Sequence, residues 1–355
     1  MKPRFVIDKN IPYIRGIFDE VADVTYLCAS DIIPKNIADI NALIVRTRTK
    51  CNASLLAGST VEAIATATIG TDHIDTEYCD NNHIKWQNAP GCNATSVSQY
   101  FASAIAEWSK YTDDTIEGKT VGIVGYGHIG RKIEKVAKSI GLKILYNDPP
   151  LAQLTNYTDK DSCCTDIEFV DLETIARECD IITFHTPLTY KGEHHTYHLA
   201  DSHFFDKISD KKPLIINAAR GGIIDEVELI RHIDSGKINA CIIDCWENEP
   251  AINTELMKRA LIATPHIAGY SADGKNNATH QVVKFISEHF NIKPNTVESL
   301  SKKRVSYTSI DELMNLFLNT YNIKNDSEKL KENHTKFEEL RSSYPERREY
   351  IIRKG

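Results

Sequence analysis

The sequence predicts an α/β protein with doubly wound parallel sheets, divided into two or three domains. Short apolar runs of strand length alternate with more polar, helix-length segments along most of the chain, which is typical of parallel strands joined by crossover helices. One run leads into a G-x-G-x-x-G turn at Gly125, Gly127 and Gly130. A chain of 355 residues is also too long for one ordinary hydrophobic core.

Composition narrows the class of protein further. Hydrophobic residues make up 41% and charged residues 26% of the chain, as expected of a soluble globular protein. The net charge is −7 and no long basic run occurs, so we expect no nucleic-acid partner. No window approaches the ~18 consecutive apolar residues of a membrane span, and the N-terminus lacks a signal-peptide core. The nine cysteines form no C-x-x-C pair, which favours reduced thiols in the cytoplasm and no metal site.

The chain before the glycine turn is expected to form a separate α/β unit. Its apolar runs predict five strands, at Arg4–Ile7, Val24–Leu27, Ala42–Val45, Val61–Ala65 and Ile84–Trp86. A helix follows over Asn93–Thr112, where apolar residues recur at helical spacing and Asn93, Thr95 or Ser96 could cap the N-terminus. We interpret this helix as the bridge into the next domain.

The glycine turn itself predicts dinucleotide binding. Gly125 allows the tight turn, Gly127 lets the backbone approach a pyrophosphate, and Gly130 lets the following helix pack against the strand. The helix that begins near His128 and Ile129 offers its unpaired N–H groups and its positive dipole end to the phosphates.

The strands on either side of this turn support the same interpretation. Thr120–Val124 leads into the turn, and Leu142–Asn147 predicts the next strand. Asp148 follows, 23 residues beyond Gly125, where an acidic side chain would accept hydrogen bonds from an adenosine ribose. The same carboxylate would repel a 2′-phosphate, which favours NAD over NADP. The alternative is that Asp148, with the two prolines after it, only makes a turn.

Four more strands are expected, at Ile181–Phe184, Leu214–Ile216, Ala240–Ile243 and Leu261–Ala263, after a helix that starts within 170–176. Functional residues in parallel sheets gather just past the carboxyl ends of the strands. Thr186, Arg220, Asp244 and His266 occupy these places in turn, and Glu249 follows Asp244. Any one of them alone could be a surface residue or a helix cap. Because each of four successive strands is followed by such a residue, the sequence indicates a functional site at this edge of the sheet.

These residue types suit the oxidation of a 2-hydroxy acid. A base must take the hydroxyl proton as hydride leaves the same carbon, and His266 is suited to this near neutral pH. Glu249 beside it would hold the imidazole and stabilise its protonated form. Arg220 could bind the substrate carboxylate through two hydrogen bonds. The alternatives are that His266 is a core or capping histidine and that Glu249 is a solvated acid in a loop.

The motifs around these residues resemble the D-2-hydroxyacid dehydrogenase family. They are the glycine turn, Asn-Ala-Ala-Arg-Gly-Gly at 217–222, Asp-x-x-Glu-x-Glu-Pro at 244–250 and Pro-His-Ile-Ala-Gly-Tyr at 265–270. The similarity runs from the N-terminus to about residue 285. It implies that Arg220, Glu249 and His266 are the catalytic set and that NAD is the cofactor.

The resemblance also implies a domain organisation. Residues 96–263 would form a Rossmann-type NAD-binding domain, and residues 1–95 with 264–295 a flavodoxin-like substrate or lid domain. Residues 296–355 would form a small C-terminal dimerisation domain of a homodimer. In this tail, Arg347 and Arg348 could reach the neighbouring subunit, although pairing with Glu346 and Glu349 on the surface is the favoured alternative.

Further binding residues follow from the resemblance. Asp244 and Gly269 would border the nicotinamide, and the residues along the rest of the cofactor would be Thr186, Ala218 and Ala219. The residues implied to reach the substrate are Thr47, Thr68 and Tyr270. Arg46, Arg48 and Lys50 crowd one short loop, a cationic patch suited to a phosphate. The alternative is that this loop is merely solvated.

Segments at 45–50, 66–75 and 89–94 resemble members of the family that oxidise a four-carbon, phosphorylated 2-hydroxy acid in the biosynthesis of pyridoxal 5′-phosphate. Two alternatives stay open. The substrate could be another 2-hydroxy acid, such as 3-phosphoglycerate or glycerate (with hydroxypyruvate as its product), or the chain could be a non-catalytic NAD sensor. The intact Arg–Glu–His set argues against a sensor, because a sensor does not need the proton-transfer pair.

Overall fold

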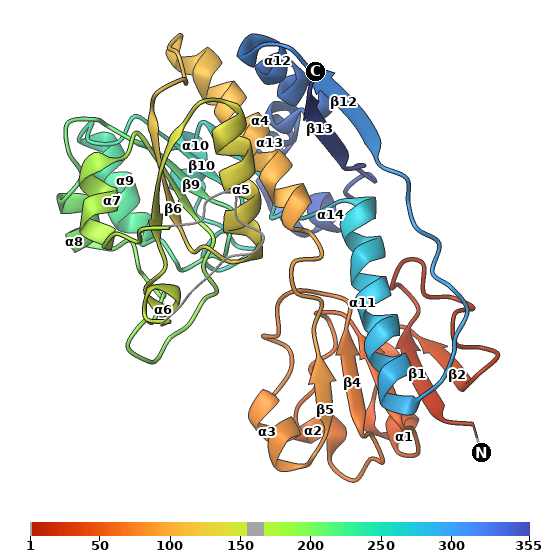
Figure 1. The fold of residues 1–355 in the computed structure, drawn as a ribbon. Helices are drawn as coiled ribbons and strands as arrows, with labels where there is room; N and C mark the ends of the chain where they lie inside the picture. Colours follow the sequence, from red (N-terminus) through yellow and green to blue (C-terminus); the bar gives the residue numbers. More distant parts are fainter. Residues whose placement is uncertain (1, 155–166) are drawn as a thin grey trace. The chain divides into compact units, whose positions relative to one another are not determined.

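The computed structural model describes residues 2–154 and 167–355, which fold into two compact units (Figure 1). The first unit comprises Met1–Asn93, Ser271–Lys303 and Arg347–Glu349, and the second comprises Ala94–Tyr270, Arg304–Glu346 and Tyr350–Gly355. Within the described ranges, no helix combines the length and apolar character that a membrane span requires.

The first unit is built on a five-stranded parallel sheet with strand order β2-β1-β3-β4-β5. The strands are β1 (Arg4–Asp8), β2 (Asp23–Leu27), β3 (Ala42–Val45), β4 (Ala63–Thr66) and β5 (Lys85–Gln87). This order is that of flavodoxin-like folds, so the predicted fold of this unit is confirmed. Its topological switch point lies between β1 and β3, where ligands of such sheets usually bind.

Helices cover both faces of this sheet. They are α1 (Pro34–Ile37), α2 (Ala53–Leu56), α3 (Thr76–Asn81) and the long α11 (Ala272–Phe290), with the 3₁₀ helix η1 (Ala29–Asp31). Val282, Val283 and Ile286 of α11 pack into a buried cluster with Phe5 and Ile7 of β1. The chain therefore returns to its first unit after completing the nucleotide-binding sheet.

The second unit contains a six-stranded parallel sheet with order β11-β10-β9-β8-β6-β7. Its strands are β6 (Thr120–Val124), β7 (Lys143–Asn147), β8 (Ile181–Phe184), β9 (Leu214–Asn217), β10 (Ala240–Ile243) and β11 (Ile262–Ala263). The order reverses between β6 and β8, and an isolated bridge from Tyr146 to Phe169 extends the sheet beyond β7. This is the Rossmann-type doubly wound topology that the sequence predicted.

Helices flank this sheet, and those from α6 to α10 begin at side-chain caps. They are α4 (Ala94–Thr112), α5 (His128–Ser139), α6 (Pro149–Ala152), α7 (Leu172–Glu178), α8 (Ser202–Asp206), α9 (Glu226–Asp234) and α10 (Thr254–Arg259). Asp171, Asp201, Asp225 and Asn253 accept backbone N–H groups in the first turns of α7 to α10. Each cap satisfies amides that would otherwise have no partner.

The C-terminal tail forms regular structure that its mixed-charge sequence did not predict. Its elements are β12 (Lys303–Tyr307), α12 (Ile310–Thr320), α13 (Ile323–Glu332), η2 (His334–Lys336), α14 (Phe337–Ser342) and β13 (Tyr350–Lys354), and β12 pairs with β13. Leu313, Phe317 and Ile323 are buried in the core of the second unit. Deleting the chain from residue 301 would therefore expose core, and would not be a clean test of assembly.

Candidate active site

The glycine turn between β6 and α5 has the geometry that the motif requires. Gly125 has φ +94°, which favours glycine, and a Cβ there would approach the carbonyl carbon of His185 to 2.8 Å. A Cβ on Gly130 would collide with the carbonyl oxygen of Gly125. A Cβ on Gly127, in contrast, would meet no atom within 4 Å. The turn is closed on its protein side and open at the residue expected to face a pyrophosphate.

The surroundings of the turn fit NAD. His128 and Ile129 start α5, so free amides of its first turn lie at the turn. The turn is at the β6–β8 reversal of the sheet, where dinucleotides bind in such folds. Beside it, the hydroxyl of Thr186 is buried without a hydrogen-bond partner among the described residues. A bound cofactor would satisfy these groups, and the cofactor contacts of all these residues stay predictions.

Asp148 at the end of β7 has two structural contacts. Its Oδ2 accepts the N–H of Tyr126 at 2.8 Å, and its Oδ1 caps α6 by accepting the N–H of Leu151 at 3.1 Å. The alternative interpretation, in which Asp148 shapes the turn, thus describes part of its role. Each carboxylate oxygen has a second lone pair, so bonds to a ribose remain compatible with this geometry.

We expect Asp148→Asn to weaken NAD binding by about 10-fold to 150-fold, because one charge-assisted hydrogen bond contributes about 1.5–3 kcal/mol. Asparagine can still cap α6 through its one oxygen, but it loses the bond from the N–H of Tyr126, so thermal unfolding of the variant is measured alongside. Discrimination against NADP should relax because the repulsion of its 2′-phosphate is gone. Fluorescence titration with both cofactors measures these effects. Unchanged rejection of NADP would show that another group sets cofactor choice.

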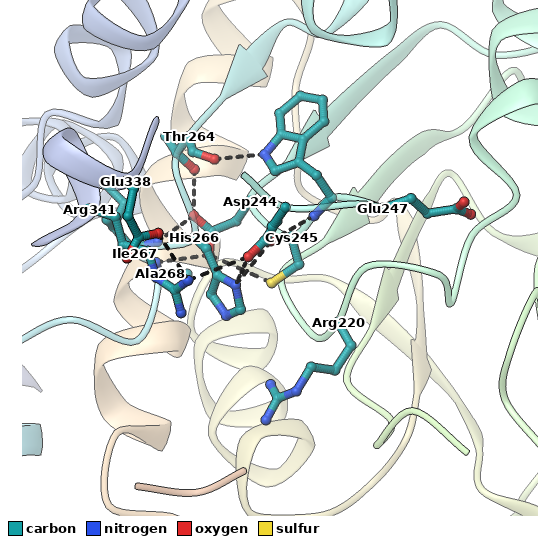
Figure 2. Close-up of polar contacts among 12 residues, drawn as sticks. Arg220, Asp244, Cys245, Glu247, Thr264, His266, Ile267, Ala268, Glu338 and Arg341 are labelled. Atoms are coloured by element: carbon teal, nitrogen blue, oxygen red, sulfur yellow. Dashed lines mark hydrogen bonds and ion pairs between the residues drawn. The ribbon is translucent and has the colours of Figure 1, made fainter. Parts of the chain in front are cut away.

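Glu249 and His266 form a hydrogen-bonded pair. Figure 2 shows His266 among the polar residues around this pair. The Nδ1 atom of His266 lies 3.0 Å from Oε1 and 2.9 Å from Oε2 of Glu249. Oε1 also accepts the backbone N–H of Trp246 at 3.0 Å. Burial alone would raise the pKa of Glu249, but the bond and charge of His266, with Trp246 and Arg341, bring it below its usual value. A carboxylate so placed orients the ring with Nε2 available to a ligand.

Asp244 holds the loop that carries His266. Its side chain is 1% exposed and accepts the hydroxyl of Thr264 at 2.6 Å and the N–H groups of Ile267 and Ala268 at 2.8 and 2.9 Å. Burial raises the pKa of Asp244 against the opposing effects of His266 and of these bonds. His266 itself has φ +55°, a conformation unusual for a non-glycine residue. The predicted nicotinamide contacts of Asp244 and of the nearby Gly269 stay untested.

Arg220 lies in the loop after β9, which packs tightly on the loop that carries Glu249. A Cβ on Gly221 would collide with the backbone of Trp246. The side chain of Asn217 fixes this loop by donating to the carbonyl of Arg220 at 2.9 Å and accepting the N–H of Ala219 at 3.2 Å. The guanidinium donates to the carbonyl of Ala219 at 2.8 Å and pairs with no carboxylate among the described residues. The guanidinium is therefore available to an anion. In the same loop, the predicted cofactor residues Ala218 and Ala219 are 7% and 5% exposed.

A buried acid supports the Glu249 loop from the other side, and sequence reasoning missed it. Glu226, 7% exposed in the first turn of α9, accepts the N–H of Glu247 at 2.8 Å. The Nε2 atom of His198 lies 2.7 Å from the Glu247 carboxylate. Burial, with a contribution from Glu247 and Glu249, raises the pKa of Glu226 to about 7. No motif marks Glu226, because its burial arises only when the two loops meet.

We expect Glu226→Gln to be more stable than the wild type at pH 8, by an amount that is absent at pH 4.5. A folded pKa of about 7, above the usual value of 4.5, means that the stability contributed by Glu226 is present below pH 4.5 and is lost as pH rises through 7. That difference corresponds to about 3 kcal/mol, which glutamine would not lose. Urea denaturation at both pH values, with Glu228→Gln as control, measures it. An equal effect at the two pH values would contradict the assignment.

The candidate substrate residues of the first unit lie at the carboxyl edge of its sheet. Thr47 follows β3 and is exposed, and Thr68 follows the neighbouring β4, where its hydroxyl lies 2.8 Å from that of Thr66. Arg46 is already paired, because its Nε lies 3.2 Å from the fully buried carboxylate of Asp8. Lys50 is exposed and has no bond to another described residue. Lys50 is thus the better candidate for a phosphate.

Of the two tail arginines, Arg348 has a partner beyond its sequence neighbours. Arg348 donates to the two carboxylate oxygens of Asp273 at 2.9 and 3.2 Å, and Glu349 pairs with Lys302 at 2.7 Å. Arg348 thus has Asp273 as a partner, and its expected pairing with Glu346 and Glu349 stays a prediction. Arg347 remains a candidate for reaching the neighbouring subunit. Tyr270, a predicted substrate residue, accepts a bond at 3.2 Å from Arg341, which no sequence feature singled out.

Cys245, Glu249 and His266 have potential metal-ligand atoms within 4.8 Å of one another. Their chemistry favours the proton-transfer pair over a metal. Burial keeps the pKa of the Cys245 thiol well above its usual value, and a thiol binds metal as the thiolate. His266 and Glu249 are already bonded to each other. We assign no metal to this cluster.

Comparison with known proteins gives similarities over most of the chain. Residues 94–268 match the family model of the D-isomer specific 2-hydroxyacid dehydrogenase, NAD binding domain. The chain is 44% identical over 350 residues to erythronate-4-phosphate dehydrogenase from Bacteroides thetaiotaomicron, covering 98% of this chain and 97% of that protein. It is 39% identical over 353 residues to the erythronate-4-phosphate dehydrogenase of Porphyromonas gingivalis, covering 98% and 93%.

Solved structures are similar in fold. The holo form of D-mandelate dehydrogenase from Rhodotorula graminis has a TM-score of 0.68 and 22% identity, covering 84% of this chain and 99% of that one. D-lactate dehydrogenase from Aquifex aeolicus, complexed with NAD and lactic acid, has a TM-score of 0.65 and 21% identity, covering 81% and 95%. At these identities the likeness shows the fold alone.

Proposed function

This chain belongs to the erythronate-4-phosphate dehydrogenase family of NAD-dependent D-2-hydroxyacid dehydrogenases, and from this premise we propose that it oxidises 4-phospho-D-erythronate at C2. The product is 2-oxo-3-hydroxy-4-phosphobutanoate. The reaction serves the biosynthesis of pyridoxal 5′-phosphate. NAD, when bound at the glycine turn, accepts the hydride from C2.

Residues of the second unit bind the substrate carboxylate and transfer the proton. Arg220 binds the C1 carboxylate, because its guanidinium offers two parallel donors and has no competing carboxylate among the described residues. The Nε2 atom of His266 takes the proton of the C2 hydroxyl, since Nδ1 is committed to Glu249. Glu249 then stabilises the imidazolium that this transfer creates.

The observation that carries this proposal is the Glu249–His266 bond in the same unit as the dinucleotide turn. A protein that only senses NAD has no use for a ring whose Nδ1 is fixed by a carboxylate and whose Nε2 is left for a ligand. The non-catalytic alternative leaves this pair unexplained.

A substrate panel tests the proposed function. The full-length protein is mixed with NAD and with 4-phospho-D-erythronate, 3-phosphoglycerate or D-glycerate, and NADH absorbance is followed with and without an added 2-oxo acid that reoxidises the cofactor. We expect turnover with 4-phospho-D-erythronate and little with the others. Preference for 3-phosphoglycerate or glycerate would replace the proposed substrate with the corresponding alternative.

We propose that Lys50 contributes to binding the substrate phosphate. Lys50→Gln should raise KM for the phosphorylated substrate by about 10-fold to 150-fold, the weight of one charge-assisted hydrogen bond. D-erythronate without phosphate should be affected little, and kcat/KM for the two acids is the measurement. Arg46→Gln is a poor substitute, because it would leave the buried Asp8 carboxylate unpaired and destabilise the fold. Equal losses for both acids would remove Lys50 from the phosphate site.

We also propose a homodimer to which the C-terminal residues 296–355 contribute, as the family resemblance implies. Sedimentation of the full-length chain tests this directly. A full-length protein that sediments as a monomer at micromolar concentration would exclude the assembly.

A further inference from the structure

The C-terminal helix α14 brings a cation to the proton-transfer pair. The Nη1 atom of Arg341 lies 3.6 Å from Oε2 of Glu249, on the carboxylate that also binds His266. Its Nε donates to the hydroxyl of Tyr270 at 3.2 Å. The side chain is 25% exposed. Arg341 thus contacts two residues of the site, although it lies in α14 and not in the loops that the sequence predicted to carry site residues.

The position of this guanidinium is fixed by packing. Phe337, in the same helix, is 1% exposed in the core of the second unit, together with Leu330 of α13. The backbone N–H of Ala263, at the end of β11, donates to the hydroxyl of Ser327 in α13 at 2.9 Å. The tail is therefore attached both to the core and to the strand that leads into the His266 loop. A side chain anchored in this way delivers its charge at a defined place.

The charge matters because oxidation needs a neutral histidine. The carboxylate of Glu249 attracts a proton to His266, and a protonated ring cannot accept the hydroxyl proton of the substrate. Arg341 offsets part of the carboxylate charge through the partly buried contact, where screening is weaker than in water. The other charged or titratable groups near the pair are Asp244 and Cys245 after β10, Glu226 in α9, Arg220 after β9, Tyr270 after β11 and Glu338 in α14. The side chain of Glu247 points away from the pair and binds His198.

We propose that Arg341 is a positioning residue that acts through Glu249, offsetting part of the carboxylate charge beside the ring of His266. The proposal rests on the proposed oxidation for its purpose, but the charge effect can be measured without turnover. Tyr270 and the core contacts of α14 hold the guanidinium in register with the carboxylate.

The test compares Arg341→Gln with Arg341→Lys. In the oxidation direction, kcat/KM rises with pH as His266 becomes neutral. Arg341→Gln should move the midpoint of this profile to higher pH by about 0.5 to 1.5 units, as expected for a unit charge several ångström away in a medium of intermediate dielectric constant. Arg341→Lys should keep the midpoint near the wild-type value. Arg353→Gln, which removes the same charge from an exposed tail position, is the matched control.

Glu338→Gln gives an independent arm, because this half-exposed acid lies 3.9 Å from Arg341 and its loss should leave the fold intact. Its negative charge opposes that of Arg341 at the pair, so its loss should move the midpoint to lower pH. Equal midpoints in wild type, Arg341→Gln and Glu338→Gln overturn the proposal. So does a loss of turnover in Arg341→Gln at an unchanged midpoint.

The titration of the His266 ring, followed by NMR in the NAD-bound protein, separates this proposal from the proposed function. An upward shift in Arg341→Gln supports the role of Arg341 even if 4-phospho-D-erythronate is not oxidised. Oxidation of that substrate without any shift supports the proposed function and overturns the role of Arg341.

Discussion

Replacing His266 with alanine is expected to lower kcat by about 10²-fold to 10⁴-fold, the usual weight of a general base. NAD affinity should change little, because most of the expected cofactor contacts lie at the glycine turn and along other loops. The ring is held by Glu249 through Nδ1, so its Nε2 is the atom that the reaction loses. Steady-state kinetics and an NAD titration measure the two effects. Near-normal turnover would remove His266 from the mechanism.

The backbone at this position requires a second variant. His266 has φ +55°, which alanine adopts less readily than asparagine. His266→Asn keeps a residue suited to this conformation and removes only the imidazole, so an equal loss in both variants assigns the effect to the ring. His203→Ala, at an exposed position of α8, is the control for a histidine outside the site.

Glu249→Gln probes the other half of the pair. Glutamine can still bond the ring, but it removes the negative charge that favours the protonated form. The pH profile of kcat/KM should therefore move to lower pH, opposite to the effect expected of Arg341→Gln. An unaltered profile would count against a charged pairing.

Sequence alone predicted the parts of this fold whose signals are local. The strands β6, β8 and β10 begin and end at the predicted residues, because each is a short apolar run bounded by polar residues. Gly125, Gly127 and Gly130 are spaced by the geometry of one turn, so a short motif suffices.

The parts that the sequence did not predict depend on distant contacts. The tail helices are short and rich in charge, and their burial is decided by packing against the core of the second unit. Arg341 belongs to a six-residue helix without a motif, and only the folded chain brings it to Glu249. Asp148 is an intermediate case, since the following prolines do indicate a helix start and its cap could have been predicted.

Arg220 is expected to have the second large effect, on substrate binding. Its guanidinium is held in a loop fixed by Asn217 and packed on the backbone of Trp246 through Gly221. This preorganisation means that little side-chain freedom is lost when a carboxylate binds. Because no described carboxylate competes for it, the bound substrate would be its main charged partner.

Arg220→Gln should therefore lower kcat/KM by about 30-fold to 4,000-fold, since removing one member of a desolvated charge pair costs about 2–5 kcal/mol. Arg220→Lys should recover only part of the loss, because lysine keeps the charge but cannot offer two parallel donors. Arg231→Gln, an exposed arginine of α9 paired with Glu228, is the control. Kinetics with 4-phospho-D-erythronate and a titration with NAD make the measurement. A loss below tenfold in Arg220→Gln, or equal activity of the lysine variant and the wild type, would show that the substrate carboxylate is bound elsewhere.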